Sequence, residues 1–479
     1  MNRESELTDT TLCTADMCKT DAKISITALS PYQIQIIIED GDKQKLSQLI
    51  NNGDMTDINW CGDKSPLKLA VESDQVDIAE LILDKGAEIN IEKLYQSEKP
   101  LTSDKVGVLD RGSEHFFKAI NSRQSLLQIA CSLGNLDMIK LLIARGVYID
   151  DDVLFMCLSK LHITLQSDQD KYDRVIQLLV ELIKNINFRH KSGGTFLHRA
   201  CINNNICLLK ALIVRGVDLT IVNNFNQSAL RVAAGLGHHG IVQLLLDSST
   251  KASITKDQLK QALLAAARYM KLEVVRILTD YGIDIDVLTS TLAIVCAKEA
   301  ISYTIHYEII ECLITHGADV YATEQGRNIW CRFVNRFDSS TIQVYDDLNE
   351  YICNTWIVFV QYGADANIIH QRSDQYILSI AKGFRMNAVK LCTILLQHGA
   401  DINLPIDTYT GESLLMNLVQ RSALNINLIK LYLEYAADVL YVNKDGHTVF
   451  DILERLGDKP QYEEIKELCM QAMSVPVLK

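Results

Sequence analysis

The sequence predicts an all-α protein in which one helix-turn-helix unit is repeated about eleven times and stacked into a solenoid. The prediction depends on two short phrases that alternate along the chain and on the regular spacing of glycines in the second phrase. Gly53 and Gly86 are 33 positions apart, and Gly282 and Gly317 are 35 apart, so the period is close to 33. Self-similarity at a period of roughly 20–50 residues is typical of solenoids, in which each unit contacts only its neighbours.

The first phrase begins with Ser or Thr, has Leu at its third position and Ala at its sixth. A Ser or Thr hydroxyl can accept a hydrogen bond from the free N–H groups at a helix start, and Pro66 suits a first turn because its missing donor is not needed there. The phrase therefore predicts the first helix of each unit. Its copies are SPLKLA (65–70), SLLQIA (125–130), TFLHRA (195–200) and SALRVA (228–233), with looser copies YILSIA (376–381), SLLMNL (413–418) and TVFDIL (448–453).

The second phrase is an apolar run, then Gly, then a short acidic-apolar tag. In LILDKGAEIN the residues from Val76 to Leu83 present the apolar face of a second helix, and Gly86 can adopt the left-handed conformation that ends it. The tag then turns outward as a loop or short hairpin. LYLEYAADVL is a copy with Ala436 at the Gly position.

Two units depart from this pattern. The unit from Thr255 to Gly282 lacks the first phrase but has Gln258 three residues after Thr255, which predicts a capping box at a helix start. The stretch 151–187 is typical of a helix pair with a polar insert, Gln166–Lys171.

The glycine spacing also predicts two inserts. Gly86 and Gly146 are 60 positions apart, 27 more than one period of 33, and the excess falls at residues 91–121. A second excess falls at residues 336–349, between the two helices of one unit. Long loops in compact repeats are functional or disordered, and both options stay open for 91–121. We expect residues 1–29 to be a disordered polar leader, residues 30–454 to be the repeats, and residues 455–479 to be a capping helix with a short tail.

Composition excludes several classes of protein. The 479 residues carry a net charge of −13 with no basic tail, which argues against a nucleic-acid partner. The 13 cysteines are scattered, mostly inside apolar helical stretches, which indicates reduced thiols in a cytosol-like compartment. The N-terminus lacks the apolar region of a signal peptide, and no apolar run approaches the roughly 18 residues of a membrane span. We expect a cytoplasmic monomer without a membrane span.

The phrases resemble those of the ankyrin repeat family. Gly194-Thr-Phe-Leu-His-Arg-Ala200 followed by 212–218 is similar to the family's G-x-T-P-L-H-x-A followed by V-x-x-L-L-x-x-G-A-D. Gly237-His238 followed by 241–246 is similar to the family's G-H-x-x-I-V-x-L-L-L. The resemblance covers about residues 30–454 and implies a fold of the ankyrin-repeat solenoid class, all-α with short loop hairpins, that binds other proteins.

Several residues could indicate chemistry, but each fits the repeat better. Gly235-x-Gly237-x-x-Gly240 spells a dinucleotide fingerprint, yet a helical and not a strand pattern precedes it. His198, His238 and His239 lack further ligands at zinc-binding spacing. Trp330 occupies the Leu position of the first phrase, which favours core packing, and Cys131 and Cys201 directly follow the repeat Ala as buried thiols. We therefore predict no catalytic residue, no metal and no cofactor.

The leading functional prediction is a non-enzymatic protein-binding module that uses its concave face and loop tips. Exposed aromatic and arginine side chains dominate protein interfaces. The candidates lie in tags, first helices or the insert 91–121: Tyr95, Phe116, Tyr148, Phe225, Arg231, Tyr321 and Arg327. In addition, LLQHGADIN (395–403) is similar to the pattern of ankyrin asparagines that a host dioxygenase hydroxylates, which makes Asn403 a candidate for that modification.

Three interpretations of the biological role stay open. Degenerate, unevenly spaced repeats rich in Ile, Asn and Lys resemble ankyrin effectors of intracellular bacteria, and the acidic then apolar C-terminus is similar to tails that type IV secretion systems read. A second interpretation is an enzyme whose catalytic segment lies in the inserts or the C-terminal region. A third is a scaffold or inhibitor in a eukaryotic cytosol.

Overall fold

The computed structural model describes residues 30–55, 57–59, 65–90, 125–161, 169–247, 254–297, 302–324, 327–336, 346–370, 375–384, 387–406, 411–421 and 424–474. For Glu324, Arg327, Asp346 and His370 it describes the backbone alone. The chain divides into two compact units, residues 1–149 and 150–479. In both units the described residues form successive pairs of antiparallel-packed helices, so the predicted all-α repeat fold is confirmed.

Unit 1 contains three described helix pairs. The first helices α1, α3 and α7 pack in succession, as do the second helices α2, α4 and α8. Each helix therefore contacts its own partner and the equivalent helix of the next pair, as expected for a repeat stack. The pairs are α1 (Pro31–Glu39) with α2 (Lys43–Asn52), α3 (Pro66–Glu72) with α4 (Val76–Asp84), and α7 (Leu126–Leu133) with α8 (Leu136–Ala144).

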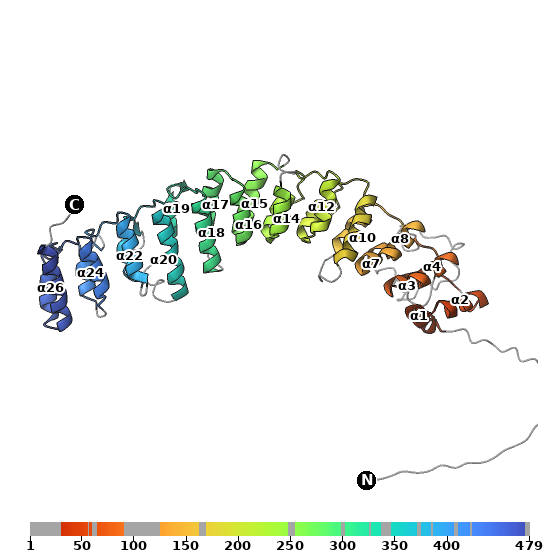
Figure 1. The fold of residues 1–479 in the computed structure, drawn as a ribbon, viewed down its shortest axis with the longest axis horizontal. Coiled ribbons are helices and arrows are strands. Elements are labelled where there is room, and N and C mark those ends of the chain that lie inside the picture. The colour runs from red at the N-terminus through yellow and green to blue at the C-terminus, as the bar shows by residue number, and fades with distance from the viewer. Residues whose placement is uncertain are drawn as a thin grey trace, which may run out of the picture. The chain divides into compact units, whose positions relative to one another are not determined.

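Unit 2 contains nine described helix pairs, and its second helices lie side by side in chain order (Figure 1). The first and second helices alternate along the chain: α9 (Asp151–Lys160), α10 (Gln169–Leu182), α11 (Phe196–Ile202), α12 (Ile206–Val214), α13 (Ala229–Leu236), α14 (His239–Leu246), α15 (Lys256–Arg268), α16 (Leu272–Asp280), α17 (Ile285–Ala297), α18 (Tyr303–Thr315), α19 (Ile329–Val334), α20 (Asp346–Gln361), α21 (Ile377–Ala381), α22 (Ala388–Gln397), α23 (Leu414–Val419), α24 (Ile426–Glu434), α25 (Val449–Leu456) and α26 (Pro460–Ser474).

The predicted helix starts are confirmed at most copies of the first phrase. The side-chain hydroxyl accepts a hydrogen bond from the backbone N–H three residues on at five of the seven copies, those that begin at Ser125, Thr195, Ser228, Ser413 and Thr448. Ser65 and Tyr376 make no such bond. At α3 the residue that favours the helix start is therefore Pro66, in the first turn. Thr255 and Gln258 form the expected capping box at the start of α15.

The predicted helix ends are confirmed as well. Gly86, Gly282 and Gly399 adopt φ angles of 94°, 91° and 89° directly after second helices. Ala436, which replaces Gly in its repeat, adopts the same left-handed region with φ of 61°. The backbone turn is therefore kept even where a Cβ atom makes it unfavourable.

Trp330 lies in the core, as its Leu position predicts. The indole is fully buried, stacks on Phe359 with 5.0 Å between ring centres and donates from Nε1 to the backbone carbonyl of Asp365 at 2.9 Å. Trp356 meets it edge-on at 6.0 Å. Aromatic pairs in these geometries contribute beyond the area they bury.

The boundaries of two predicted segments differ from expectation. Helix α10 begins at Gln169, so the last part of the insert expected at Gln166–Lys171 is helical. Helix α20 begins at Asp346, so the last part of the segment expected as an insert at 336–349 is also helical. The leader at residues 1–29 and the insert at 91–121 lie outside the described residues. At the other end α26 lies in the segment expected to be a capping helix, and it packs on α25 and α24.

Candidate interaction surface

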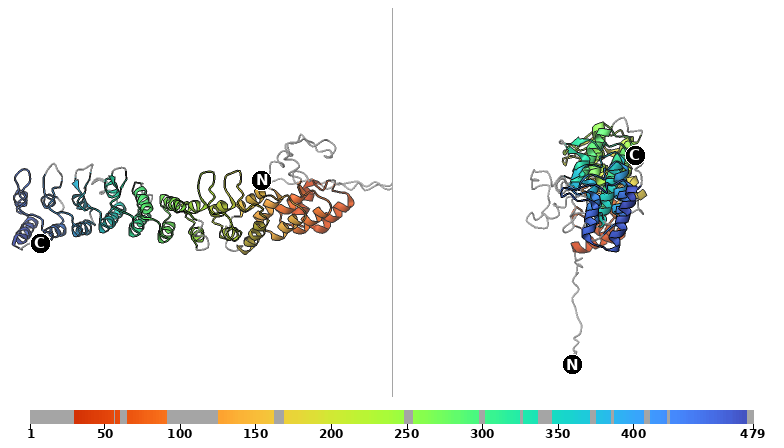
Figure 2. Two further views of the ribbon diagram at one scale, coloured as in Figure 1. Left: turned by 90° about the horizontal axis from the view of Figure 1, so that it is seen from above. Right: turned by 90° about the vertical axis from the view of Figure 1, so that its left-hand side faces the viewer.

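Short hairpins precede several first helices of unit 2, and we call them fingers. Two are paired strands: β1 (Thr323–Glu324) with β2 (Arg327–Asn328), and β3 (Ile369–His370) with β4 (Gln375–Tyr376), both antiparallel. The others are closed by a single bridge or by backbone hydrogen bonds, at residues 189–195, 222–228, 405–413 and 443–447. Figure 2 (left) shows the loops of unit 2 projecting from one side of its helices.

The row of fingers is interrupted before α17. Helix α16 ends at Asp280 and α17 begins at Ile285, so residues 281–284 alone connect them. This connection is too short for a finger. Among the described residues, accordingly, no loop projects over the green helices in the middle of unit 2 (Figure 2). The structure therefore presents two groups of fingers separated by a gap.

Phe225 lies at the tip of the finger 222–228. The backbone N–H of Asn223 donates to the carbonyl of Gln227 at 2.9 Å, and the N–H of Asn226 donates to the carbonyl of Asn223 at 3.0 Å. The side-chain Oδ1 of Asn223 accepts from the N–H groups of Phe225 and Gln227 at 2.9 and 3.0 Å. These bonds fix the turn, while the Phe225 ring is 77% exposed.

The same turn occurs in two other fingers with a different residue at the tip. In the finger 189–195, the N–H of His190 donates to the carbonyl of Gly194, and the N–H of Gly193 donates to the carbonyl of His190. In the finger 443–447, Asn443 makes the same two bonds with His447 and Gly446. The tip position holds Ser192 in the first of these and Asp445 in the second. Because the turn forms with Ser or Asp, it does not require a phenyl ring, and the exposure of Phe225 has no explanation in the fold.

Asparagine side chains connect the tags of successive repeats. Asn403 donates from Nδ2 to the carbonyl of Ala436 at 3.4 Å, and its Oδ1 accepts from the N–H of Asp438 at 2.8 Å. Asn367 makes the same two contacts one repeat earlier, with Gly399 and Asp401, at 2.9 and 2.7 Å. In unit 1, Asn90 does so with Gly146 and Tyr148. The Asn of the recurring tag, two residues after Asp or Glu, thus has a structural role in joining neighbours.

Sequence comparison agrees with these features. The ankyrin repeats family, in its three-copy form, matches residues 161–258 and 197–289, and the single ankyrin repeat matches residues 122–151. The chain is an ankyrin-repeat protein. Ankyrin repeats form protein–protein interaction modules, and the fingers and tags of this ankyrin protein are its candidate surface.

Three relatives illustrate how much is shared. The human Notch-regulated ankyrin repeat-containing protein is 36% identical over 69 residues, which is 14% of this chain and 60% of that protein. A putative ankyrin repeat protein of Rickettsia bellii is 28% identical over 127 residues, 26% of this chain and 69% of that protein. An ankyrin repeat and KH domain-containing protein of Caenorhabditis briggsae is 26% identical over 278 residues, 54% of this chain but 10% of that protein. The chain therefore spans a small part of the KH-domain relative.

The predicted contact residues fall into different surroundings. Phe225 and Tyr321 (58% exposed) lie on a finger tip and a tag, and Tyr148 is exposed in unit 1. Arg231, in contrast, is half-buried in α13. Arg327 lies in β2, where the structure describes its backbone alone. Tyr95 and Phe116 lie outside the described residues.

Leu440 and Val442 are among the exposed apolar residues of the ankyrin surface that the sequence did not single out. Leu440, the last residue of LYLEYAADVL, and Val442 just after it are 56% and 55% exposed. They lie three residues and one residue before the turn sequence Asn443-Lys-Asp-Gly446, which could have marked them as part of a finger. The hydroxyl of Tyr321, moreover, donates to the carbonyl of Gly363, so this ring is held against the next repeat.

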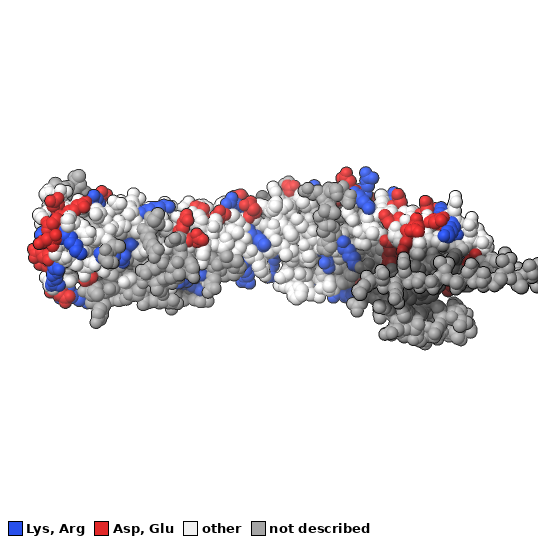
Figure 3. Space-filling view, turned by 90° about the horizontal axis from the view of Figure 1, so that it is seen from below, with Lys and Arg blue, Asp and Glu red and all other residues white. Residues whose placement is uncertain are grey.

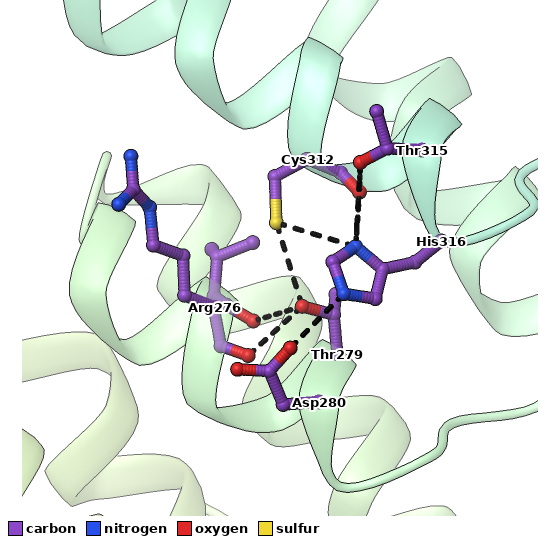
Figure 4. Close-up of polar contacts among 7 residues, drawn as sticks. Arg276, Thr279, Asp280, Cys312, Thr315 and His316 are labelled. Carbon is purple, nitrogen blue, oxygen red and sulfur yellow. Dashed lines mark hydrogen bonds and ion pairs between the residues drawn. The ribbon is translucent and has the colours of Figure 1, made fainter.

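A cysteine, a histidine and an aspartate meet between α16 and α18 (Figure 4). His316 Nδ1 lies 3.8 Å from the Sγ of Cys312, and His316 Nε2 lies 3.0 Å from Oδ1 of Asp280. The composition is that of a nucleophile, a base and an orienting acid. The geometry must therefore decide whether this group could support catalysis.

The hydrogen bonds assign this group a structural role. His316 Nδ1 lies 2.7 Å from the backbone carbonyl of Cys312, which can only accept, so this nitrogen donates and cannot take the thiol proton. Burial raises the pKa of the Cys312 thiol. His316 is the C-cap of α18, and it links the end of that helix to Asp280 at the end of α16. The contact joins two repeats and does not form an activated nucleophile.

Several other thiols and His198 are buried in the fold. Burial raises the pKa of Cys201, Cys296 and Cys392 to about 12, which keeps them protonated. His198 is buried, with Nδ1 2.8 Å from Oγ1 of Thr195 and Nε2 2.9 Å from the carbonyl of Gln227. The structure places no group of three potential metal ligands together in the part of the chain that it describes.

Charged side chains are distributed over the surface in both signs (Figure 3). On the face shown, red atoms gather at the end that carries α26, whose exposed residues include Glu463, Glu464 and Glu467. No described helix combines the length and the apolar character that a membrane span requires. An acidic end favours a partner with basic or mixed charge.

Proposed function

We propose that this ankyrin-repeat protein is a non-enzymatic binding protein that recognises a protein partner through its fingers, tags and first helices. The observation that carries the proposal is Phe225. It is a large apolar side chain presented to solvent on a turn that hydrogen bonds hold in one conformation. A contact residue that is already ordered costs little conformational entropy on binding.

The comparison among fingers supports this assignment. Ser192 and Asp445 occupy the equivalent tip positions, so a polar residue there is compatible with the turn. An exposed phenyl ring loses about 1.5–3 kcal/mol of favourable transfer free energy compared with a buried one. A protein partner that covers the ring would recover that free energy.

The proposal can be tested by photo-crosslinking from position 225. A photoreactive phenylalanine analogue at this position should give a discrete crosslinked species with host-cell lysate. Excess unlabelled wild-type protein should compete for it, and excess Phe225→Asp should compete at least tenfold less well. The variant copies the residue of the last finger, so the turn is kept.

Val214 provides the matched control. It is 86% exposed at the end of α12, a second helix that is not part of any finger. Val214→Asp should compete like the wild type, and the analogue at position 214 should give no equivalent species. Equal crosslinking from both positions, or equal competition by both variants, would remove the fingers as the binding surface.

The biological setting is a further part of the proposal. We propose that the chain acts as a bacterial effector inside a host cell, which the similarity to the Rickettsia bellii protein supports. A translocation reporter fused to the full chain should give a signal in host cells infected with the source bacterium. Replacing Glu463, Glu464 and Glu467 by Gln should lower that signal if the acidic C-terminal segment is read by a secretion system. A reporter signal that is absent with the full chain would contradict an effector role.

A further inference from the structure

The gap in the row of fingers opens a small cleft between α17 and β1. The cleft encloses about 280 Å³. Because residues 281–284 form no finger, the first turns of α17 and the side of β1 that faces them are left uncovered. Its floor is apolar, with Ala293 and Ile329 buried, and Ile285 stands at its edge with 58% of its side chain exposed.

The polar lining of the cleft is acidic. Asp286 on α17 and Asp319 in the tag after α18 are both exposed and both line the cleft, together with the hydroxyls of Thr289 and Ser290. Among the side chains that the structure describes, no Lys, Arg or His lines the cleft. Charge complementarity therefore points to a cation.

The fold holds the carboxylate of Asp319, and it neutralises neither Asp319 nor Asp286. Asp319 Oδ1 accepts from the N–H of Tyr321 at 2.8 Å, and the N–H of Asp319 donates to Oγ1 of Thr289 at 2.9 Å. Nearby Asp284 is already paired with Lys256 at 3.0 Å. Within the described part of the chain, neither Asp286 nor Asp319 forms an ion pair.

We infer that this cleft receives a basic side chain, Lys or Arg, of the protein partner. The aliphatic stem would pack on Ile285 and the apolar floor, and the charged head would lie between the carboxylates of Asp286 and Asp319. Long basic side chains bury their stems on apolar surface in this way. The inference rests on the proposed function, since it names one subsite of the same binding surface.

The test uses a short peptide, acetyl-Gly-Arg-Gly-amide, and does not need the identified partner. The full chain is labelled at isoleucine δ1-methyl groups, so that Ile285 and Ile329 report directly on the cleft. The peptide should shift both methyl signals in a saturable manner at low salt, and added salt should weaken the binding. The same peptide with citrulline, which has nearly the same shape but no charge, should bind at least fivefold more weakly.

Two double variants separate the cleft from general surface charge. The double variant Asp286→Asn with Asp319→Asn should bind the peptide at least fivefold more weakly than the wild type. Asp365→Asn with Asp401→Asn removes the same charge from tags that make the equivalent turn, with N–H to Oδ1 distances of 2.8 and 2.9 Å. This control should leave the peptide affinity unchanged.

Several results would overturn the inference. They are the absence of a saturable shift at Ile285 and Ile329, equal binding of the citrulline peptide, or an equal effect of the two double variants. Such a failure would leave the crosslinking result at Phe225 untouched. Conversely, failure of the crosslinking test would rule out the fingers as the binding surface even if the peptide binds. The two outcomes can therefore be distinguished.

Discussion

Asn403 and Asp438 join two successive repeats, because the side-chain amide oxygen of Asn403 accepts the backbone N–H of Asp438 at 2.8 Å. The same amide donates to the carbonyl of Ala436. The side chain thus replaces water at two backbone groups of the next tag. The hydroxylation of Asn403 that its sequence pattern suggests stays a prediction, and these contacts are what the modified side chain would have to keep.

Replacing Asn403 should destabilise the repeat stack. Asn403→Ala removes both contacts, and each net hydrogen bond contributes about 0.5–1.5 kcal/mol, so a loss of about 1–2 kcal/mol is expected from urea unfolding. Asn427→Ala on the exposed side of α24 is the control and should be neutral or slightly stabilising, because Ala favours helix. Equal effects of the two changes would show that the contacts contribute nothing.

Ala436→Gly should stabilise the protein. Ala436 adopts φ of 61°, and the left-handed region costs a non-glycine residue about 1–2 kcal/mol, part of which glycine loses again through its freedom when unfolded. We expect a gain of about 0.5–1 kcal/mol in the free energy of unfolding. The reverse change, Gly399→Ala, should destabilise by a similar amount. An added Cβ there meets nothing within 4 Å, so the backbone conformation alone is tested.

His198→Gln should reduce the loss of stability at mildly acidic pH. Burial lowers the pKa of His198, opposed by its hydrogen bond to the carbonyl of Gln227. Between that lowered value and the value of 6.5 expected for the unfolded chain, the unfolded state binds a proton that the native state does not. Stability therefore falls as pH falls through this window, by at most about 1.4 kcal/mol per pH unit for one group.

Glutamine is a suitable replacement because Gln258 holds the equivalent position in α15. It forms the same capping box with Thr255 and donates to the carbonyl of Leu219 at 3.2 Å. Urea midpoints at pH 7.5 and 5.5 give the measurement. The difference between the two midpoints should be smaller in the variant than in the wild type. It should not vanish, because burial also lowers the pKa values of His190 and His238. An unchanged difference between the midpoints would show that His198 does not contribute to the pH dependence of stability.

Trp330→Leu should destabilise the protein although Leu is the residue of the repeat phrase. The surrounding core is built around the indole, with Phe359 stacked on it and Trp356 at its edge. A cavity and a lost hydrogen bond to the carbonyl of Asp365 together should cost about 3–5 kcal/mol. Trp330→Phe keeps a ring and should cost less. A thermal unfolding midpoint that does not change in the Leu variant would contradict this account.

Most of the fold could be predicted from the sequence because its causes are local. A hydroxyl at a helix start, an apolar face of helical period and a left-handed residue at a helix end each act within a few positions. Ala436 shows how far this extends, since the repeat pattern alone placed it at the turn where it has a positive φ. The same pattern placed Trp330 in the core.

The parts that could not be predicted depend on contacts between repeats. Arg231 is half-buried by its surroundings, and the hydroxyl of Tyr321 is held by Gly363 of the next repeat, 42 positions away. The helical residues at the starts of α10 and α20 are polar, and their helix is stabilised by packing that a local pattern does not contain.

The sequence by itself determined that the chain is a series of helix pairs, where most pairs begin and end, and which large side chains enter the core. Only the tertiary structure decided which loops form fingers, and that the chain lacks one before α17. The tertiary structure also brought Asp286 and Asp319 to one cleft, 33 positions apart in the sequence. The physical reason is that capping and periodicity act along the chain, whereas a binding surface is made by side chains from neighbouring repeats.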